Sequence, residues 1–326
     1  MFKYILKRLV YLIAVFFLVS MIIYGLNRSM PGDPVLAMMQ DVTGLEPEAW
    51  QRMYDDARAR MRLDEPVINQ YFAWITNIIT GNFGYSHYYR QDVVDVIRYP
   101  MLNTVIINIF NMMFVFSITI FLGITAAVRR GSVYDAFVQV ISVIGFSFPT
   151  FVLAILVIFV FAVNLGWFPI SGMYTPNFQG TTGEFIFDRA YYMTLPLLTM
   201  VVGSLGGMTR YVRTTMAEAL TMDHIRTARA KGLAEKVVIY SHAFRNALIP
   251  LLTVMTNWFI TVFGGSVALE RVFNWNGMGG LMLEALWNRD FNLASILSLF
   301  YAAIALTGFL LLDLVYGIAD PRVRVH

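Results

Sequence analysis

Long apolar segments alternate with shorter polar segments along the whole chain. A helix that spans a lipid bilayer needs about 20 mostly apolar residues. The segments of sufficient length lie at residues 9–29, 101–128, 136–164, 191–209, 246–269 and 291–315. None of these segments has an ionisable residue near its centre. Asp313 lies at the end of the last segment, and Glu270 follows the fifth. The pattern predicts an all-α membrane protein with six spanning helices.

Composition supports a bilayer environment, since 58% of the residues are hydrophobic and 14% are charged, with a mean hydropathy of +0.62. The net charge of +3 comes without any base-reading motif, so we expect no nucleic-acid partner. There is no cysteine, which excludes disulfides and thiol nucleophiles. The apolar run that begins at Leu9 follows three basic residues but precedes no small-residue cleavage site, so we interpret it as a retained first membrane helix.

Lys and Arg are distributed unevenly between the two sides of the predicted helices, and cytoplasmic loops carry the excess of these residues. With the N-terminus inside, the cytoplasmic segments hold Lys3, Lys7, Arg8, Arg129, Arg130, Arg210, Arg213, Arg226, Arg229, Lys231, Lys236, Arg245, Arg322 and Arg324. The short outer segments hold Arg28, Arg189, Arg271 and Arg289. We therefore expect a multi-pass protein of the inner (cytoplasmic) membrane, in contact with lipid and with both termini cytoplasmic.

Three longer polar segments separate the predicted helices. Segment 30–100 is expected outside the membrane, with a surface helix over residues 47–63 and an aromatic stretch over 71–90 against the outer membrane face. Segment 165–190 is rich in Gly, Pro and Thr and is predicted to be irregular. Segment 210–249 is expected inside.

Sequence motifs typical of nucleotide binding, catalysis or metal binding are absent. There is no GxxxxGK[ST] phosphate-binding loop and no HExxH, and the four histidines are scattered, so neither a catalytic nor a metal site is predicted. An ion-coupled secondary carrier usually places ionisable residues at mid-membrane, and an intramembrane enzyme needs a catalytic constellation. Both alternatives are disfavoured, and energy for transport would have to come from a partner.

Neutral polar residues mark one face of two predicted helices. They are Thr104, Asn108 and Asn111 on the second, and Thr253, Thr256, Asn257 and Thr261 on the fifth. Two interpretations stay open: hydrogen bonds between helices, or the lining of a translocation pathway by Asn108, Asn111, Thr253 and Asn257. In the fourth helix, Gly203 and Gly207 form a pair that is typical of close helix packing, with a flexible gate as the alternative.

The inner segment contains a run of good helix formers, residues 215–231, and Gly232 is placed to end that helix. Ala228 and Ala230 are small enough to let another protein approach the backbone, and three neighbouring basic residues provide surface charge. The helix therefore suits insertion into a cleft of a partner. The alternative is a basic loop that lies on anionic lipid.

A resemblance bears on this choice. The stretch "RTARAKG", followed by "RNALIP", resembles the EAA loop of ABC-importer permeases in the form found in the oligopeptide/dipeptide family. The usual Glu-Ala-Ala is replaced by Arg226, Thr227 and Ala228, and the proline comes late, as Pro250; both departures favour the peptide branch. The stretches "MFKYILKRLVYLI", "MPGDP", "LDEPVINQYFAWITNIITGNFGYS" and "ALERVFNWNGMGGLMLEALWNRDFN" resemble the same family in the same order.

The resemblance implies a type I importer permease bundle over residues 1–326, with the outer insertion at 30–100 and a coupling loop at 210–249. It implies that the chain is the first of two different permease subunits, which bind two ATPase subunits inside and a solute-binding protein outside. ATP and Mg²⁺ would then bind to the ATPase partners, with no cofactor in this chain. The implied ATPase-coupling residues are Arg226, Thr227, Ala228, Arg229, Ala230, Lys231 and Gly232.

The segment after the fifth helix is a candidate outer gate or docking rim, through Glu270, Phe273 and Gly277. Its alternative is an interfacial loop anchored by Trp275. The function expected is import of di- or oligopeptides, with nickel-chelate or glutathione import as alternatives in the same family. For the coupling helix we expect Gly232→Pro or Ala228→Trp to leave the permease in the membrane but to uncouple it from ATP hydrolysis.

Overall fold

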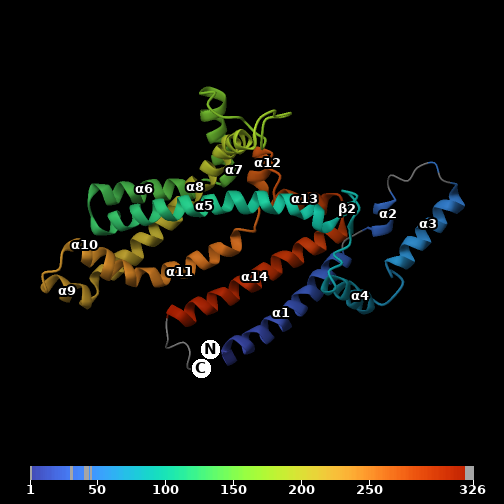
Figure 1. Ribbon diagram of the computed structural model, residues 1–326, viewed down its shortest axis with the longest axis horizontal. Coiled ribbons are helices and arrows are strands. Elements are labelled where there is room, and N and C mark those ends of the chain that lie inside the picture. The colour runs from blue at the N-terminus through green and yellow to red at the C-terminus, as the bar shows by residue number, and fades with distance from the viewer. Residues whose placement is uncertain (1, 30–31, 40–43, 45, 320–326) are drawn as a thin grey trace. The chain divides into compact units, whose positions relative to one another are not determined.

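The computed structural model describes residues 2–29, 32–39, 44 and 46–319, and most of this part of the chain is helical (Figure 1). It forms two compact units. The first contains the chain up to Leu102 and residues 277–310, and the second contains residues 103–276 and the chain from Leu311. The long helices α5 (Val93–Val128) and α14 (Phe291–Ala319) contribute to both units.

The first unit holds the segment expected outside the membrane. Besides its parts of α5 and α14, its elements are α1 (Phe2–Arg28), α2 (Pro34–Met38), α3 (Pro47–Arg60), α4 (Val67–Ile79), strands β1 (Tyr85–Ser86) and β2 (Gln91–Asp92), and α13 (Met278–Trp287). The two strands pair antiparallel, with Tyr85 opposite Asp92. The helix predicted over 47–63 is confirmed as α3, which begins at a proline, a residue preorganised for the first helical position.

Helix α4 contacts α1 through polar and aromatic side chains. Tyr71 is 2% exposed, and its hydroxyl lies 2.8 Å from the Ser20 hydroxyl. The Tyr24 ring contacts the rings of Tyr71 and Trp74. The neighbouring Phe72 stays 57% exposed. These contacts fix α4 along the C-terminal half of α1.

A buried carboxylate organises the start of α14. Asp290 is 1% exposed and accepts a hydrogen bond from the Leu293 amide at 3.1 Å, as an N-cap residue does. It also accepts from the Ser86 hydroxyl of β1. The adjacent core consists of apolar residues from α5, α13 and α14, among them Val93, Met278 and Leu297. The short hairpin is thereby tied to α14.

The second unit contains most of the second predicted span and all of the third, fourth and fifth. Its further elements are α6 (Val133–Ser147), α7 (Thr150–Val157), the π-helix η1 (Ile158–Asn164), α8 (Thr182–Thr221), α9 (Asp223–Ala230), α10 (Glu235–Val237), the π-helix η2 (Val238–Ala243), α11 (Phe244–Thr261) and α12 (Val267–Phe273). Over the described residues, four helices are long and apolar enough to span a membrane, or up to six if each of two bent pairs makes one span.

The predicted third span, 136–164, is one of these bent pairs. Helix α6 and the combined α7–η1 segment meet at an angle of 102°. The bend lies at Phe148, whose ψ of 132° is extended, and at Pro149, which starts the next helix. A proline disfavours helical conformation in the residue before it, which explains the break. The fifth predicted span, 246–269, is not one continuous helix either. Helix α11 ends at Thr261, and α12 begins only after a Gly-Gly-Ser sequence.

The prediction that 165–190 is irregular was wrong for its last third. Helix α8 begins at Thr182, and Thr181 and Glu184 form a reciprocal capping box at its start. The helix then continues for 40 residues through the predicted fourth span. The single helix predicted over 215–231 is instead divided, because Met222 adopts an extended ψ of 147° between α8 and α9.

Helices α6 and α8 pack closely at a glycine, but not at the predicted pair. A Cβ atom added to Gly206 would lie 2.1 Å from the Ser142 carbonyl oxygen. The same addition to Gly203 or Gly207 would meet no heavy atom closer than 3.9 Å and 3.6 Å. The backbones therefore touch at Gly206, and the sequence pair Gly203–Gly207 flanks that contact.

Candidate coupling helix and cavity

Helix α9 has the C-terminal signal that the sequence predicts. Gly232 has a φ of +76°, and its N–H donates to the Arg229 carbonyl at 2.9 Å. The Leu233 N–H donates to the Ala228 carbonyl at 3.4 Å. These two hydrogen bonds form a Schellman motif, in which glycine is the residue that adopts positive φ without strain. Gly232 as the helix stop is confirmed.

The inner face of α9 packs against its own chain. Ile225 is fully buried and Ala228 is 5% exposed. Both belong to a cluster that includes Met216 of α8 and Val238 and Ala243 of η2. The expectation that Ala228 offers a small face to a partner was therefore wrong. Its small size serves the close approach of α9 to the rest of the second unit.

The outer face of α9 carries the other predicted coupling side chains. The exposed positions in this stretch are Arg226, Thr227, Arg229, Ala230, Lys231 and Gly232. Arg229 forms an ion pair with Glu235, with nitrogen–oxygen distances of 2.7 and 3.2 Å. The hydrogen bonds to Glu235 raise the pKa of Arg229 against the smaller opposing effect of desolvation, so the guanidinium stays charged. An exposed small residue, Ala230, lies between two cationic side chains.

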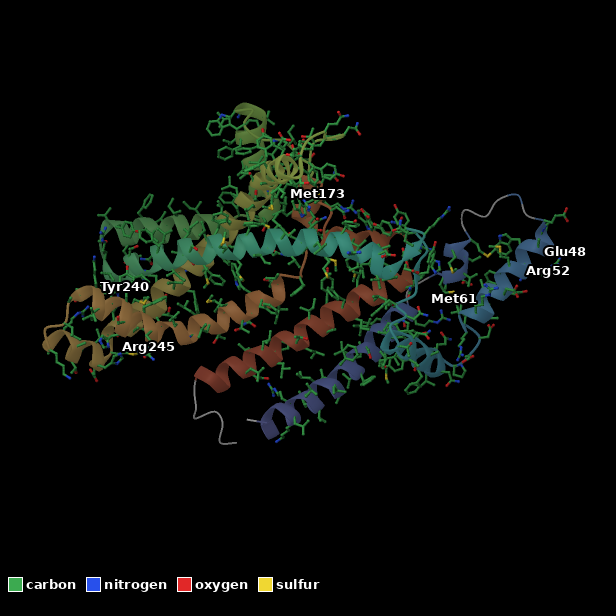
Figure 2. All side chains as sticks on the ribbon, in the orientation of Figure 1. Glu48, Arg52, Met61, Met173, Tyr240 and Arg245 are labelled. Carbon is green, nitrogen blue, oxygen red and sulfur yellow. The ribbon has the colours of Figure 1, made fainter. Side chains whose placement is uncertain are left out.

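Helix α9 is also tied to the start of α11. The amide nitrogen of Asn246 lies 2.8 Å from His224 Nε2 and donates to the His242 carbonyl at 2.9 Å. Figure 2 marks Tyr240 and Arg245 on the same η2–α11 stretch, where both side chains are exposed. A force on α9 would therefore reach α11 through a packed core and a polar link.

A cavity of about 290 Å³, lined by both apolar and polar residues, lies in the second unit. Its lining residues come from α5, α8, α11 and α12 and from the segments beside α12: Thr104, Ile107, Asn108, Asn111, Met200, Ser204, Trp258, Thr261, Gly264, Gly265, Ser266, Leu269, Glu270 and Trp275. Asn108 Nδ2 donates to the carbonyls of Val262 and Gly264 at 3.0 and 3.1 Å. These carbonyls lie beyond the end of α11, so the Asn108 side chain stabilises the break between α11 and α12.

Two buried polar atoms of the cavity lining have no hydrogen-bond partner among the described residues. They are Asn111 Oδ1 and Trp275 Nε1, from residues that are 8% and 3% exposed. Among the lining residues that the structure describes, Glu270, which is 5% exposed, is the one ionisable residue. Trp275 is therefore buried and does not form the exposed interfacial anchor considered from the sequence.

Only some of the predicted pathway residues meet here. Asn108 and Asn111 line the cavity, whereas Thr253 and Asn257 do not, and Asn257 is exposed. Helical periodicity predicts the side of each helix on which these four residues lie. It does not predict which parts of the two helices pack against each other. Sequence reasoning did not connect Glu270 and Trp275 with Asn111, and the nearest signal was the Gly264–Gly265 pair that interrupts an apolar run.

The candidate gate segment is fixed by the loop that precedes α8. The Gly172 N–H donates to the Phe273 carbonyl at 2.8 Å, and Phe273 is 1% exposed. Asn103 Nδ2 donates to the Asn276 carbonyl at 2.7 Å. The Met173 sulfur, marked in Figure 2, accepts from the Asn276 N–H at 3.3 Å. Of the predicted gate residues, Glu270 and Phe273 are thus buried in the second unit.

The third predicted gate residue has a local structural role. Gly277 is extended, with φ −129° and ψ −179°, and stands immediately before α13 in the first unit. Its carbonyl accepts the Leu281 N–H at 3.0 Å, so it forms the first hydrogen bond of that helix.

Helices long and apolar enough to span a membrane, an exposed basic helix and a cavity in the second unit are features that fit an integral membrane transport subunit. Comparison with known families agrees. Residues 119–325 match the family described as binding-protein-dependent transport system inner membrane component, and residues 1–108 match the N-terminal component of the same kind of system. The chain belongs to this family. It is a multi-pass inner-membrane permease subunit with the type I ABC importer fold.

Curated relatives match over the full length. The chain is 32% identical to the oligopeptide transport system permease protein AppB of Bacillus subtilis over 325 residues, which is 99% of this chain and 100% of the relative. It is 33% identical to the di/tripeptide transport system permease protein DppB of Pseudomonas aeruginosa, with 99% of each chain covered. It is also 33% identical to the glutathione transport system permease protein GsiC of Escherichia coli (strain K12), again with 99% of each covered.

Proposed function

We propose that this chain forms half of the transmembrane pathway of an ATP-driven importer of di- or oligopeptides. The observation that carries the proposal is the end-to-end similarity to permeases whose names specify oligopeptide and di/tripeptide transport. The cavity supports it, because its lining combines apolar residues with polar residues that are neutral apart from Glu270. The glutathione permease is equally similar, so glutathione, itself a tripeptide, is the second candidate cargo.

The transporter requires partners for energy and for cargo capture. The sequence has no phosphate-binding loop, so ATP hydrolysis belongs to separate subunits. We assign two ATPase subunits to the cytoplasmic side, a second homologous permease to the membrane, and a solute-binding protein to the outside. ATP and Mg²⁺ bind on the ATPase subunits in this assignment.

The exposed face of α9 is the proposed contact with an ATPase subunit. Its free surface combines a small residue, Ala230, with the charges of Arg226, Arg229 and Lys231. Its buried face joins it to α8 and η2, so a movement of the ATPase would be passed to the spanning helices. Closing of the ATPase pair on ATP would then open the bundle outward, and their separation would open it inward.

The orientation that goes with this proposal places both termini and residues 210–249 in the cytoplasm and residues 30–100 outside. The asymmetric distribution of Lys and Arg supports it. A cysteine introduced at Arg130, an exposed position outside the proposed ATPase contact, should then react with a membrane-impermeant maleimide only in inverted vesicles. One at Glu48, on the exposed helix α3 (Figure 2), should react in intact spheroplasts.

The decisive experiment is purification of the tagged chain in mild detergent, followed by mass spectrometry and an ATPase assay. We expect two ATPase subunits and a second six-helix chain to co-purify, with hydrolysis stimulated by a peptide-loaded binding protein. Stimulation by a glutathione-loaded binding protein alone would assign the second candidate cargo. A chain that purifies without any ATPase subunit would contradict the proposal.

A further inference from the structure

A separate cavity of about 340 Å³ lies within the first unit. Its wall includes Arg28, the last residue of α1, together with Arg60 and Arg62, at the end of α3 and in the turn after it. Met61, marked in Figure 2, stands between those two arginines in the sequence and also lines the cavity. The cavity is therefore lined both by the end of a candidate membrane span and by the polar segment that follows that span.

The charge of this lining has one sign. Among the lining residues that the structure describes, three are arginines and none is Asp or Glu. Arg28 is partly exposed, Arg60 is exposed and the Arg62 side chain is 56% exposed, so all three side chains keep accessible surface. The carboxylate of Glu65 lies near Arg62, but the nitrogen–oxygen distance of 3.9 Å is too long for a hydrogen bond. A concave surface with charges of one sign concentrates ions of the opposite sign, so this cavity favours an anion.

The backbone at Arg62 indicates that its side chain has a function. Arg62 has a φ of +53°. Its N–H donates to the Ala59 carbonyl at 3.0 Å, and the Leu63 N–H donates to the Arg58 carbonyl at 3.1 Å, so a Schellman motif ends α3. Glycine adopts this left-handed conformation without strain, whereas arginine does not. Strained residues cluster at ligand-binding sites, which gives the guanidinium of Arg62 a reason to be there.

A fourth arginine reaches the edge of the same cavity. Gly32 lines the cavity, and a Cβ atom added to it would lie 3.3 Å from Arg289 Nη1. The Arg289 guanidinium therefore lies next to the Gly32 backbone. Arg289 also has a φ of +53°, in the turn that follows α13. Two arginines with unfavourable backbone conformations thus bring positive charge to one cavity.

The position of the cavity indicates that a lipid supplies the anion. Only 6% of the apolar stretch of α1 is buried within the chain, and Ile22 and Leu26 are 52% and 64% exposed. In a bilayer, acyl chains cover such a surface towards the helix end at Arg28. Tyr24 and Trp74 line the cavity with ring centroids 5.2 Å apart, and Trp and Tyr are enriched at the membrane–water interface. A phospholipid bound here would have its acyl chains on α1 and its headgroup in the cavity.

We propose that this cavity binds the headgroup of an anionic phospholipid, with Arg28, Arg60 and Arg62 donating hydrogen bonds to its phosphate. Guanidinium groups match phosphate oxygens through paired N–H donors. The volume of about 340 Å³ lies within the range of roughly 300–1,000 Å³ for ligand pockets. The assignment of this lipid to the outer leaflet rests on the orientation in the proposed function. The bound lipid connects the end of α1 to the end of α3 and so holds segment 30–100 at the membrane surface.

The test measures lipid binding by the full tagged chain, purified in mild detergent together with any partner subunits that accompany it. Phosphatidylglycerol with brominated acyl chains is added stepwise, and the quenching of tryptophan fluorescence is followed. Phosphatidylcholine with the same brominated chains is the zwitterionic comparison. The part of the quenching that Trp74→Phe removes reports on this cavity, because Trp74 belongs to its lining.

Three variants change the charge of the lining. Arg60→Gln and Arg62→Gln each remove one positive charge. Arg62→Gly removes the same charge and also relieves the left-handed backbone conformation. Arg52→Gln is the matched control, because Arg52 lies on α3, has a side chain that is 77% exposed and does not line the cavity.

We expect the apparent Kd of wild type for phosphatidylglycerol to be at least about tenfold lower than its Kd for phosphatidylcholine. Each of the three cavity variants should raise the Kd for phosphatidylglycerol about tenfold, the size of one lost charged hydrogen bond, and Arg52→Gln should leave it unchanged. Arg62→Gly should also keep or raise the Tm of the lipid-free chain, which separates loss of binding from loss of folding. Inorganic phosphate at the same concentration as the lipid should not displace it.

Three results would overturn the inference. Equal quenching of Trp74 by the two lipids in wild type is one, and it decides the matter even if a variant fails to fold. Wild-type affinity in all three cavity variants is another. Displacement of phosphatidylglycerol by an equal concentration of inorganic phosphate is the third, because it would show a site for a free anion in place of a lipid. The readout is binding and not transport, so a failed peptide-uptake or ATPase assay would count against the proposed function alone.

Discussion

The guanidinium of Arg213 on α8 holds the carboxylate of Asp135 on α6 through two hydrogen bonds, at 2.6 and 2.7 Å. Asp135 is 3% exposed and Arg213 is 17% exposed, so the pair is largely buried. The Gly131 N–H and the Gln139 amide also donate to the same carboxylate. This bidentate geometry locks the start of α6 onto α8, a role for Arg213 that its position in a basic segment does not reveal.

Removal of one partner of this pair should be strongly destabilising, because it leaves the other charge buried without compensation. We expect Asp135→Ala to lower the free energy of unfolding by roughly 3 kcal/mol. Urea titration of the purified chain in detergent measures this. Arg210→Ala, an exposed arginine one turn earlier, is the control and should change stability by less than about 0.5 kcal/mol. Equal stability of the two variants would show that the pair contributes little.

The close contact of α6 and α8 gives a second prediction with a built-in control. Gly206→Ala forces a Cβ atom against the Ser142 carbonyl and should cost about 1–3 kcal/mol as the helices separate. Gly203→Ala meets only the Leu153 side chain at 3.9 Å and should be neutral or stabilising by up to about 1 kcal/mol, since alanine favours helix. Thermal melts of the two variants test this, and a Gly206→Ala chain as stable as wild type would contradict the packing.

The coupling helix gives a third prediction, which replaces one made from sequence. Ala228→Trp would overpack the chain's own core and lower its folding yield, so it cannot report on docking. Ala230→Trp adds bulk on the exposed face and should leave the membrane level unchanged while it reduces peptide-stimulated ATP hydrolysis about tenfold or more. Wild-type stimulation in Ala230→Trp would remove this face from the ATPase contact.

Gly232→Pro should affect coupling in a different way, because it disrupts the C-terminal end of α9. Proline cannot adopt the φ of +76°, and it lacks the N–H that bonds to the Arg229 carbonyl. We expect loss of the Schellman motif and of coupling. Gly232→Asn, which tolerates positive φ, should retain most of the wild-type stimulation. Equal activity of the proline and asparagine variants would show that the helix end is irrelevant to coupling.

The local stability of the chain around Asp33, at the start of segment 30–100, should depend on pH. Partial burial opposes ionisation of Asp33, but hydrogen bonds from the Tyr54 hydroxyl and the Val35 and Leu36 amides, with the charge of Arg58, lower its pKa overall. Because the pKa is lower in the folded state than the unfolded value of about 3.9, the ionised Asp33 stabilises the folded state at pH values above that unfolded value. This contribution is lost as the pH falls through the folded-state pKa. Hydrogen exchange of the Val35 amide, corrected for its intrinsic rate, should therefore accelerate on acidification. Asp33→Asn should remove most of this dependence.

Local sequence signals determined much of the secondary structure. The apolar segments, the proline that starts α3 and the glycine that ends α9 act within a few residues, so they can be recognised without the fold. The break at Phe148–Pro149 and the capping box at Thr181 were equally local and were available in the sequence, although the prediction of continuous or irregular segments overlooked them.

The sequence by itself determined that this is a helical membrane protein with a basic helix between two spans and with polar positions such as Asn111 on an apolar helix. Tertiary structure decided which face of α9 is free, because Ala228 and Ala230 differ only in what packs against them. It also brought Asn111 and Trp275 to one cavity. The physical reason is that helical periodicity fixes the side on which a residue lies, whereas its neighbours depend on the packing of segments far apart in the chain.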